Sequence, residues 1–262
     1  MTGSSTMTTG TSPLRGILFD KDGTLIDFNA SWMAPCKAAA AWLAETAGQP
    51  ERSGELLTLG GFDAASDTWA ADSLLASGTA DQVLALWSDA LDVSVGDAER
   101  IRMASFFEDA SAVPYPAVDD LRAWFERWRA RGYALGIATM DDERGARHLL
   151  EQLDAADSVD FVAGYDSGHG LKPEPGMLLA FCDLCQLQPA EVVMVGDSPR
   201  DLAMGRAAGA GLVVGIAGVT ASHEELAPLA DHVLDALEAL EHLPELQDAT
   251  HREQASEENR AP

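Results

Sequence analysis

The sequence of 262 residues contains few cysteines and no long hydrophobic run. Three cysteines, Cys36, Cys182 and Cys185, are too few for a disulfide framework, and their number is odd. No second Cys/His pair at zinc spacing accompanies Cys182 and Cys185, which favours two small apolar helix residues. The longest weakly polar run, residues 209–221, is too short and too rich in glycine to span a bilayer. The N-terminus lacks the apolar segment of a secretory signal, so we expect a cytoplasmic protein.

Basic residues are also scarce. Lysine occurs only as Lys21, Lys37 and Lys172, and 17 basic residues face 43 acidic ones, which gives a formal net charge of -26. Such a surface repels nucleic acids and anionic membranes, so we expect neither as a partner. The hydrophobic share of 47% is enough for a large core, either in one domain or in a domain with an insert. The oligomeric state cannot be derived from the sequence.

The order of expected elements indicates an α/β protein. Strands and helices alternate after residue 117, which is typical of a parallel sheet. A helical block between about residues 30 and 112 interrupts this alternation and predicts an insert after the first strand. Apolar runs predict strands at 14–19, 133–138, 161–164, 192–195, 212–216 and 232–234. Helical periodicity predicts helices at 38–47, 81–91, 98–107, 119–131, 144–153, 176–185 and 199–208.

Polar residues fall where the expected strands end, which is where open parallel sheets bind ligands. Asp20 and Asp22 leave the first strand together, and Gly23 allows a sharp turn. One carboxylate of such a pair can bind a hard cation and attack phosphorus, while the other protonates the leaving oxygen. A calcium loop does not fit, because its twelfth position is Ser31 rather than Glu. Thr139 ends the next core strand, where its hydroxyl can bind a phosphate oxygen.

Two later segments add further charged groups. Lys172, followed by two prolines, is suited to neutralise a phosphoryl group. Asp197 follows a strand directly and is a good candidate metal ligand. Asp201 occupies the third position of a helix that Ser198 caps, where an acidic residue favours the helix dipole by itself. Each segment alone is also explained by an ordinary turn or cap.

Together the four segments resemble the haloacid dehalogenase superfamily of phosphohydrolases. Its Asp-x-Asp-Gly-Thr signature matches residues 20–24, its strand-end Ser/Thr and its Lys match Thr139 and Lys172, and Gly-Asp-x-x-x-Asp matches residues 196–201. The helix that follows, residues 201–209, is similar to that of phosphoglycolate phosphatase-like members. The resemblance implies a Rossmann-like parallel α/β core with an inserted helical cap. The expected domains are a core at 13–28 and 114–244, a cap at 29–113, and disordered tails at 1–12 and 245–262.

The resemblance also implies a catalytic role for each matched residue. Asp20 is expected to attack phosphorus, and Asp22 to act as acid and base. Lys172 is expected to complete the catalytic set. The phosphoryl group is expected to lie against Thr139, Met140 and Gly23. Many relatives carry Asn where this chain has Met140, so only the backbone N–H of that residue is expected to contribute.

A magnesium ion is the expected cofactor. The resemblance places it on the carboxylate of Asp20, the backbone carbonyl of Asp22, Asp197, and Asp201 directly or through water. The expected reaction is the hydrolysis of a small phosphorylated metabolite through an aspartyl-phosphate. The expected cap carries few basic residues, which disfavours substrates with several charges, and 2-phosphoglycolate fits best.

Other reactions on the same fold stay open as alternatives. A sugar phosphomutase uses the same core and cap and differs only in the acceptor of the phosphoryl group. A haloacid dehalogenase needs neither a metal nor Asp22. A phosphonate hydrolase would need a Schiff-base lysine from the cap, where Lys37 is the only candidate. A non-catalytic regulatory protein would be expected to lack Asp20, Asp22, Lys172 or Asp197, and all four are present.

Overall fold

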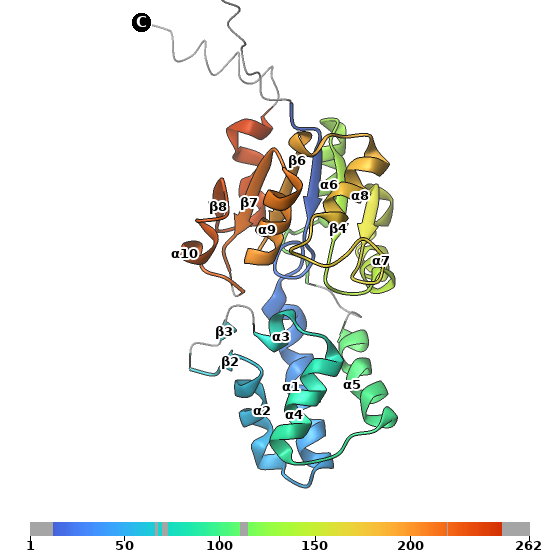
Figure 1. Ribbon diagram of the computed structural model, residues 1–262, viewed down its shortest axis with the longest axis vertical. Coiled ribbons are helices and arrows are strands. Elements are labelled where there is room, and N and C mark those ends of the chain that lie inside the picture. Colours follow the sequence, from blue (N-terminus) through green and yellow to red (C-terminus); the bar gives the residue numbers. More distant parts are fainter. Residues whose placement is uncertain (1–12, 66–67, 70–72, 111–114, 219, 248–262) are drawn as a thin grey trace, which may run out of the picture.

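The protein has two parts in the computed structural model, a sheet with helices on both faces and a smaller helical block (Figure 1). The structure describes residues 13–65, 68–69, 73–110, 115–218 and 220–247. Nearly all of the two expected disordered tails lies outside the described residues. The exception is the start of the C-terminal tail, residues 245–247. Residues 245 and 246 belong to a 3₁₀ turn, η5 (Pro244–Leu246), that buries Leu246 in the core.

The larger part is built on a six-stranded sheet of order β5-β4-β1-β6-β7-β8 in which all neighbouring strands are parallel. The first strand of the chain therefore lies inside the sheet, between β4 and β6. The expected parallel α/β core is confirmed. The strands are β1 (Gly16–Phe19), β4 (Ala134–Ala138), β5 (Phe161–Ala163), β6 (Val192–Gly196), β7 (Leu212–Ile216) and β8 (His232–Leu234).

Alternation of apolar side chains along the strands explains the layers on the two faces. Ile17 and Phe19 pack with the helices α6 (Leu121–Ala130) and α7 (Glu143–Gln152), in a cluster that contains Trp124 and Phe125. Leu18 packs on the opposite face with helices α8 (Gly176–Cys185) and α9 (Pro199–Ala208). Successive side chains of a strand point to opposite faces, so both faces of the sheet are buried.

The inserted block has a hydrophobic core of its own, separate from the clusters of the sheet. Its longest helix, α1, extends from Phe28 to Thr46 and contains Pro35, so it begins earlier than the expected helix at 38–47. A short antiparallel hairpin, β2 (Phe62–Asp63) with β3 (Thr68–Trp69), was not expected from the sequence. The remaining helices of the block are α2 (Ser53–Leu59), α3 (Leu74–Ser77), α4 (Ala80–Leu91) and α5 (Asp97–Ala110).

The chain enters and leaves the inserted block through two neighbouring segments. The Asp27 N–H donates to the Tyr115 carbonyl and the Ala117 N–H to the Leu25 carbonyl, both at 2.8 Å. Ile26 and Pro116 form an antiparallel bridge between them. The block, which we call the cap, is thus joined to the core at one place, next to the carboxyl end of β1.

Candidate active site

The expected site residues meet where the parallel strands end, on the side of the sheet that faces the cap (Figure 1). Asp20 follows β1 directly, and its N–H donates to the Val195 carbonyl of β6 at 2.8 Å. Asp197 follows β6, and Thr139 follows β4. Because β1 lies between β4 and β6, these three residues come from neighbouring strand ends.

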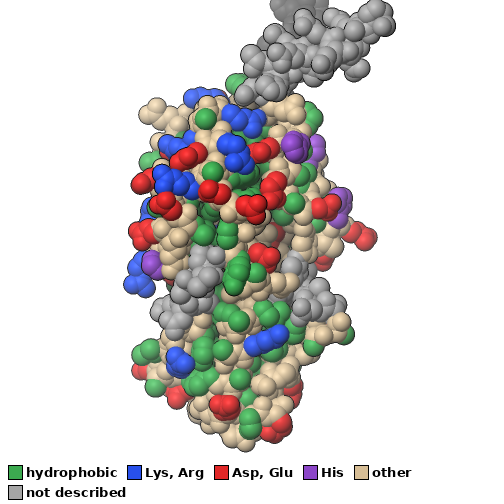
Figure 2. All heavy atoms as spheres, turned by 180° about the vertical axis from the view of Figure 1, so that it is seen from behind, with side chains coloured by type: hydrophobic (Ala, Val, Ile, Leu, Met, Phe, Trp, Pro, Cys, Tyr) green, Lys and Arg blue, Asp and Glu red, His purple; other side chains and the backbone are tan. Residues whose placement is uncertain are grey.

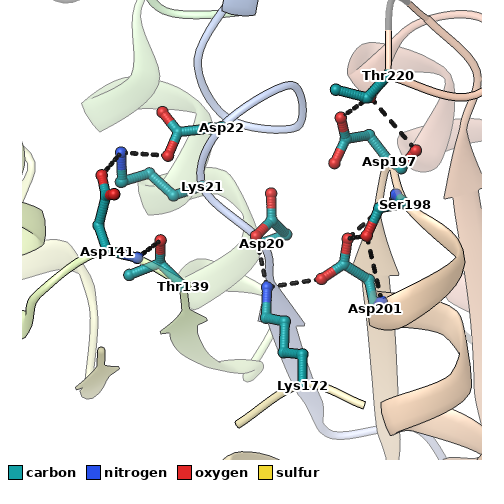
Figure 3. A network of polar contacts seen from close by, with 10 residues as sticks. All are labelled: Asp20, Lys21, Asp22, Thr139, Asp141, Lys172, Asp197, Ser198, Asp201 and Thr220. Atoms are coloured by element: carbon teal, nitrogen blue, oxygen red, sulfur yellow. Dashed lines mark hydrogen bonds and ion pairs between the residues drawn. The ribbon is translucent and has the colours of Figure 1, made fainter. Parts of the chain in front are cut away.

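Lys172 lies at the centre of the site. Its Nζ is 2.5 Å from Oδ1 of Asp20 and 2.6 Å from Oδ1 of Asp201, and the three side chains are almost fully buried (Figure 3). Burial opposes the charged form of this lysine, but the two carboxylates outweigh it and raise the pKa of Lys172. The ammonium therefore stays charged at neutral pH.

Asp20, Asp197 and Asp201 form a cluster whose carboxylate oxygens lie within 4.8 Å of one another. Burial raises the pKa of Asp20 to about 7, against the attraction of Lys172. Burial, followed by the charges of Asp20 and Asp201, raises the pKa of Asp197 well above its usual range. Oδ2 of Asp20 is buried without a hydrogen-bond partner among the described residues. Carboxylates that repel one another, with one free oxygen, fit a hard divalent cation.

Asp201 has a structural task besides its place in this cluster. Its Oδ2 accepts from the Ser198 N–H at 3.1 Å and from the Ser198 hydroxyl at 2.6 Å, which completes the capping box of α9. Its other oxygen contacts Lys172. Asp201 is therefore both the capping residue of α9 and a member of the carboxylate cluster, and the capping box determines where its carboxylate points.

Gly23 is needed for the close approach of two loops. Its φ is +84°, and a Cβ at this position would collide with the carboxylate of Asp197. The glycine therefore lets the turn after β1 lie directly against the carboxylate cluster of Asp20, Asp197 and Asp201. The contact that the structure gives Gly23 is thus with Asp197.

The segment after β4 supplies a polar group and a second acid. Thr139 is buried, and its Oγ1 accepts from the Asp141 N–H at 3.1 Å, so the hydroxyl hydrogen is free to point elsewhere. Met140 between them is half-buried. Asp142, which follows Asp141, caps α7 by accepting a hydrogen bond from the Gly145 N–H at 2.8 Å.

The side chain of Asp22 lies apart from the carboxylate cluster. Its Oδ2 is 2.5 Å from Nζ of Lys21, and its Oδ1 accepts from Nε1 of Trp32 at 2.9 Å. Figure 3 shows the carboxylate turned toward Lys21. Burial raises the pKa of Asp22, with Lys21 opposing and Asp141 adding to the shift. A protonatable carboxyl with a raised pKa is suited to acid–base work.

Four residues around the site were missed in the sequence. Lys21 bridges Asp22 and Asp141, and it could have been singled out as one of three lysines, inside the signature itself. Trp32 contacts Asp22, which precedes it by ten residues, and Asp141 contacts Lys21 on another loop of the core; no local pattern predicts either contact. Thr220, in the loop after β7, hydrogen-bonds the Asp197 carboxylate and has no sequence signal either.

The haloacid dehalogenase-like hydrolase family model matches residues 14–209. The chain belongs to this family. A phosphoglycolate phosphatase of Pseudomonas putida is 30% identical over 216 residues, which cover 80% of this chain and 71% of that protein. An N-acetylmuramic acid 6-phosphate phosphatase of the same species is 26% identical over 196 residues, 75% of this chain and 80% of the relative.

The crystal structure of a haloacid dehalogenase superfamily hydrolase of subfamily IA from Geobacter sulfurreducens shares the fold. Its TM-score is 0.63 at 20% identity, over 91% of this chain and 100% of that one. The expected family, fold class and enzyme class, a phosphatase of this superfamily, are confirmed. The described residues include no helix of the length and apolarity that a membrane crossing requires.

Proposed function

We propose that this protein is a Mg²⁺-dependent phosphomonoesterase that acts on a small phosphorylated metabolite through an aspartyl-phosphate at Asp20. The observation that carries the proposal is the convergence of Asp20, Lys172 and Asp197 with Asp201. Asp20 is buried and has one carboxylate oxygen without a hydrogen-bond partner among the described residues, and the ammonium of Lys172 contacts its other oxygen. Together with Asp197 and Asp201, Asp20 forms a carboxylate cluster suited to a cation. Phosphoryl transfer depends mainly on this kind of positioning and charge neutralisation.

The first step transfers the phosphoryl group to the protein. An oxygen of Asp20 attacks phosphorus, the bond from phosphorus to the ester oxygen breaks, and Asp22 gives its proton to the leaving alkoxide. Lys172 and the Thr139 hydroxyl bind the oxygens of the phosphoryl group. The ammonium of Lys172 already contacts Asp20, so this positive charge lies where negative charge develops on the phosphoryl group.

The second step releases phosphate. Asp22, now ionised, takes a proton from water as the water oxygen attacks phosphorus. The bond between phosphorus and Asp20 then breaks, which restores the carboxylate. The same residue serves as acid and then base, which a raised pKa allows.

The cation would be held by Asp20, Asp197 and Asp201, the three carboxylates of the cluster. We retain the backbone carbonyl of Asp22 as a further ligand. When bound, Mg²⁺ supplies positive charge that offsets the repulsion between the substrate phosphate and these acids. This local charge is necessary because the chain as a whole carries a formal net charge of -26.

The scarcity of basic residues in the cap, where the sequence has only Lys37, Arg52, Arg100 and Arg102, supports a small substrate with few charges. On the face shown in Figure 2 the cap presents mainly hydrophobic and uncharged atoms, and charged side chains gather on the core. Within the relatives named above, one acts on phosphoglycolate and one on N-acetylmuramic acid 6-phosphate. We propose 2-phosphoglycolate as the substrate, because it is the smaller of the two.

A screen of small phosphate esters with Mg²⁺ tests the proposal, with Asp20→Asn as the matched variant. We expect release of inorganic phosphate that an excess of chelator abolishes, and a loss of about 10⁴-fold or more in Asp20→Asn. Equal turnover by this variant would overturn the assignment of the nucleophile. Full activity in chelator would overturn the metal role. Transfer of phosphate to a sugar hydroxyl, without release into water, would instead indicate a phosphomutase.

A further inference from the structure

A second buried lysine lies beside the proposed acid/base. Lys21 stands between Asp20 and Asp22 in the sequence, and its side chain is 3% exposed. Its Nζ is 2.5 Å from Oδ2 of Asp22 and 2.8 Å from Oδ2 of Asp141, a residue in the loop after β4 (Figure 3). The lysine therefore links two loops of the core through two carboxylates.

The cap holds the same carboxylate from its other side. Nε1 of Trp32, in the first cap helix α1, donates to Oδ1 of Asp22 at 2.9 Å. The ring of Trp32 also lies 5.5 Å from Nζ of Lys21, within range of a cation–π contact. Both oxygens of Asp22 thus have partners, one from the core and one from the cap.

Stability alone does not account for this arrangement. A buried ion pair often contributes less to stability than apolar residues of similar volume, because both charges lose their hydration. Here two carboxyl groups share one ammonium, so the cluster has an excess of negative charge whenever both are ionised. What the contacts do fix is the direction of the Asp22 side chain, which lies outside the cluster of Asp20, Asp197 and Asp201.

We propose that Lys21 and Trp32 are positioning residues for Asp22, with Lys21 anchored by Asp141, so that the orientation of the acid/base depends on the position of the cap. The inference rests on the proposed function, since it assigns these residues to the proton transfers of that reaction. Lys21 fixes the carboxylate relative to the core, and Trp32 makes its orientation depend on α1.

The two steps of the reaction give this proposal a specific signature. An alkyl phosphate needs the proton of Asp22 to release its strongly basic alkoxide. An aryl phosphate such as p-nitrophenyl phosphate releases a weakly basic phenolate and does not need it. Both substrates need Asp22 as base to hydrolyse the aspartyl-phosphate. A misplaced Asp22 therefore slows both steps with alkyl esters but only the second step with the aryl ester.

The experiment compares Lys21→Met, Trp32→Phe and Asp141→Asn with wild type on glycerol phosphate and p-nitrophenyl phosphate, with Mg²⁺ present. We expect Lys21→Met to lower kcat for glycerol phosphate about 100-fold. With p-nitrophenyl phosphate the first turnover should stay within about tenfold of wild type and appear as a burst of p-nitrophenol before a slow steady state. Trp32→Phe, which keeps the ring and removes the donor, should show the same pattern with a smaller loss.

Asp142→Asn is the matched control, because it changes the neighbouring acid and keeps a good helix cap on α7. This variant should show neither the selective loss nor the burst. The double variant Lys21→Met/Asp141→Asn guards against unfolding, since it removes the carboxylate that Lys21→Met leaves unpaired. Trp32→Phe changes no charge and gives a second route to the same readout.

Equal losses on both esters without a burst would overturn the inference, because a general structural defect slows every step alike. Unchanged kinetics in Lys21→Met would overturn it as well. If wild type hydrolyses neither ester nor any other phosphate ester, the proposed function fails and the inference fails with it. A wild type that turns over both esters, together with unselective variants, overturns the positioning role alone.

Discussion

The site contains two buried lysines, and each holds two carboxylates. Lys172 binds Asp20 and Asp201, whose side chains are less than a tenth exposed, and all three residues belong to the core. Lys21 binds Asp22 and Asp141, and the side chain of Asp141 is 46% exposed. The Lys172 group is sealed in the core, whereas the Lys21 group lies at the boundary with the cap.

The balance of formal charge differs in the same way. When ionised, the three carboxylates around Lys172, which include Asp197, exceed its ammonium by two charges, and a divalent cation would neutralise this excess. When both of its carboxyl groups are ionised, the Lys21 group carries an excess of one negative charge, and it has no third carboxylate among the described residues. The difference supports the proposal that the Lys172 group would hold the cation and the phosphoryl group, and that the Lys21 group orients Asp22.

The largest expected difference between the two lysine groups is in how their variants act on alkyl and aryl phosphates. Lys172→Met should lower kcat/KM by about 10²- to 10³-fold on alkyl and aryl phosphates alike, because its charge stabilises the phosphoryl group whichever alcohol leaves. Lys21→Met should be selective for alkyl esters. Steady-state kinetics on both substrates measures the contrast. Selectivity by leaving group in Lys172→Met would remove the distinction between the two groups.

A second expected effect concerns thermal stability as a function of pH and Mg²⁺. Burial raises the pKa of Asp20 from 3.8 to about 7, so between these values the folded state binds a proton that the unfolded state has released. In the metal-free protein, the contribution of Asp20 to the free energy of unfolding is therefore fully present below pH 3.8. This contribution is lost as the pH rises through about 7. Mg²⁺ needs ionised carboxylates, so its stabilisation should be larger at pH 8 than at pH 5, and about 2.7 kcal/mol at 100 times Kd.

Differential scanning fluorimetry with and without Mg²⁺ measures this effect. Asp197→Asn should lose most of the Mg²⁺-dependent rise in Tm, and Lys21→Met should keep it, since only the first change touches the carboxylate cluster. A Tm that does not respond to Mg²⁺ at any pH would contradict the assignment of the cluster as a metal site.

The smallest expected effect tests the packing of the turn against the cluster. Gly23→Ala places a methyl group on the Asp197 carboxylate at a φ of +84° and should destabilise the fold by about 1–3 kcal/mol while weakening Mg²⁺ binding. Gly132→Ala is the control, because Gly132 has a φ of +86° and its added methyl group meets no atom within 4 Å. Chemical denaturation and Mg²⁺ titration distinguish strain, which both variants share, from the collision, which only Gly23→Ala has.

Much of the core could be predicted from the sequence because its signals are local. Apolar runs located the strands, and Asp20, Thr139 and Asp197 could be placed at the ends of strands before the order of the sheet was known. Ser198 and Gly209 marked the two ends of α9 through a capping box and a left-handed residue, respectively. These features depend on a few neighbouring residues, so the sequence alone determines them.

The cap and the surroundings of Asp22 depend on contacts between distant residues. The expected helix at 38–47 began too late, because packing of residues on both sides of Pro35 stabilises α1 from Phe28 onward. The ion pair of Lys21 with Asp141 joins two loops far apart in the chain. No pattern in the sequence around Asp141 points to Lys21 as its partner.

The closed base of the cap has a consequence for folding. Leu25–Asp27 and Tyr115–Ala117 are hydrogen-bonded to each other, so the chain returns to the core about one strand spacing, roughly 4.8 Å, from where it left. Once the cap has folded, Gly16 and Ala134 are connected by a short path, although they pair across the whole insert. The entropy of closing a long loop is then replaced by that of a short one. An insert of another size could therefore be exchanged for the cap without changing the sheet.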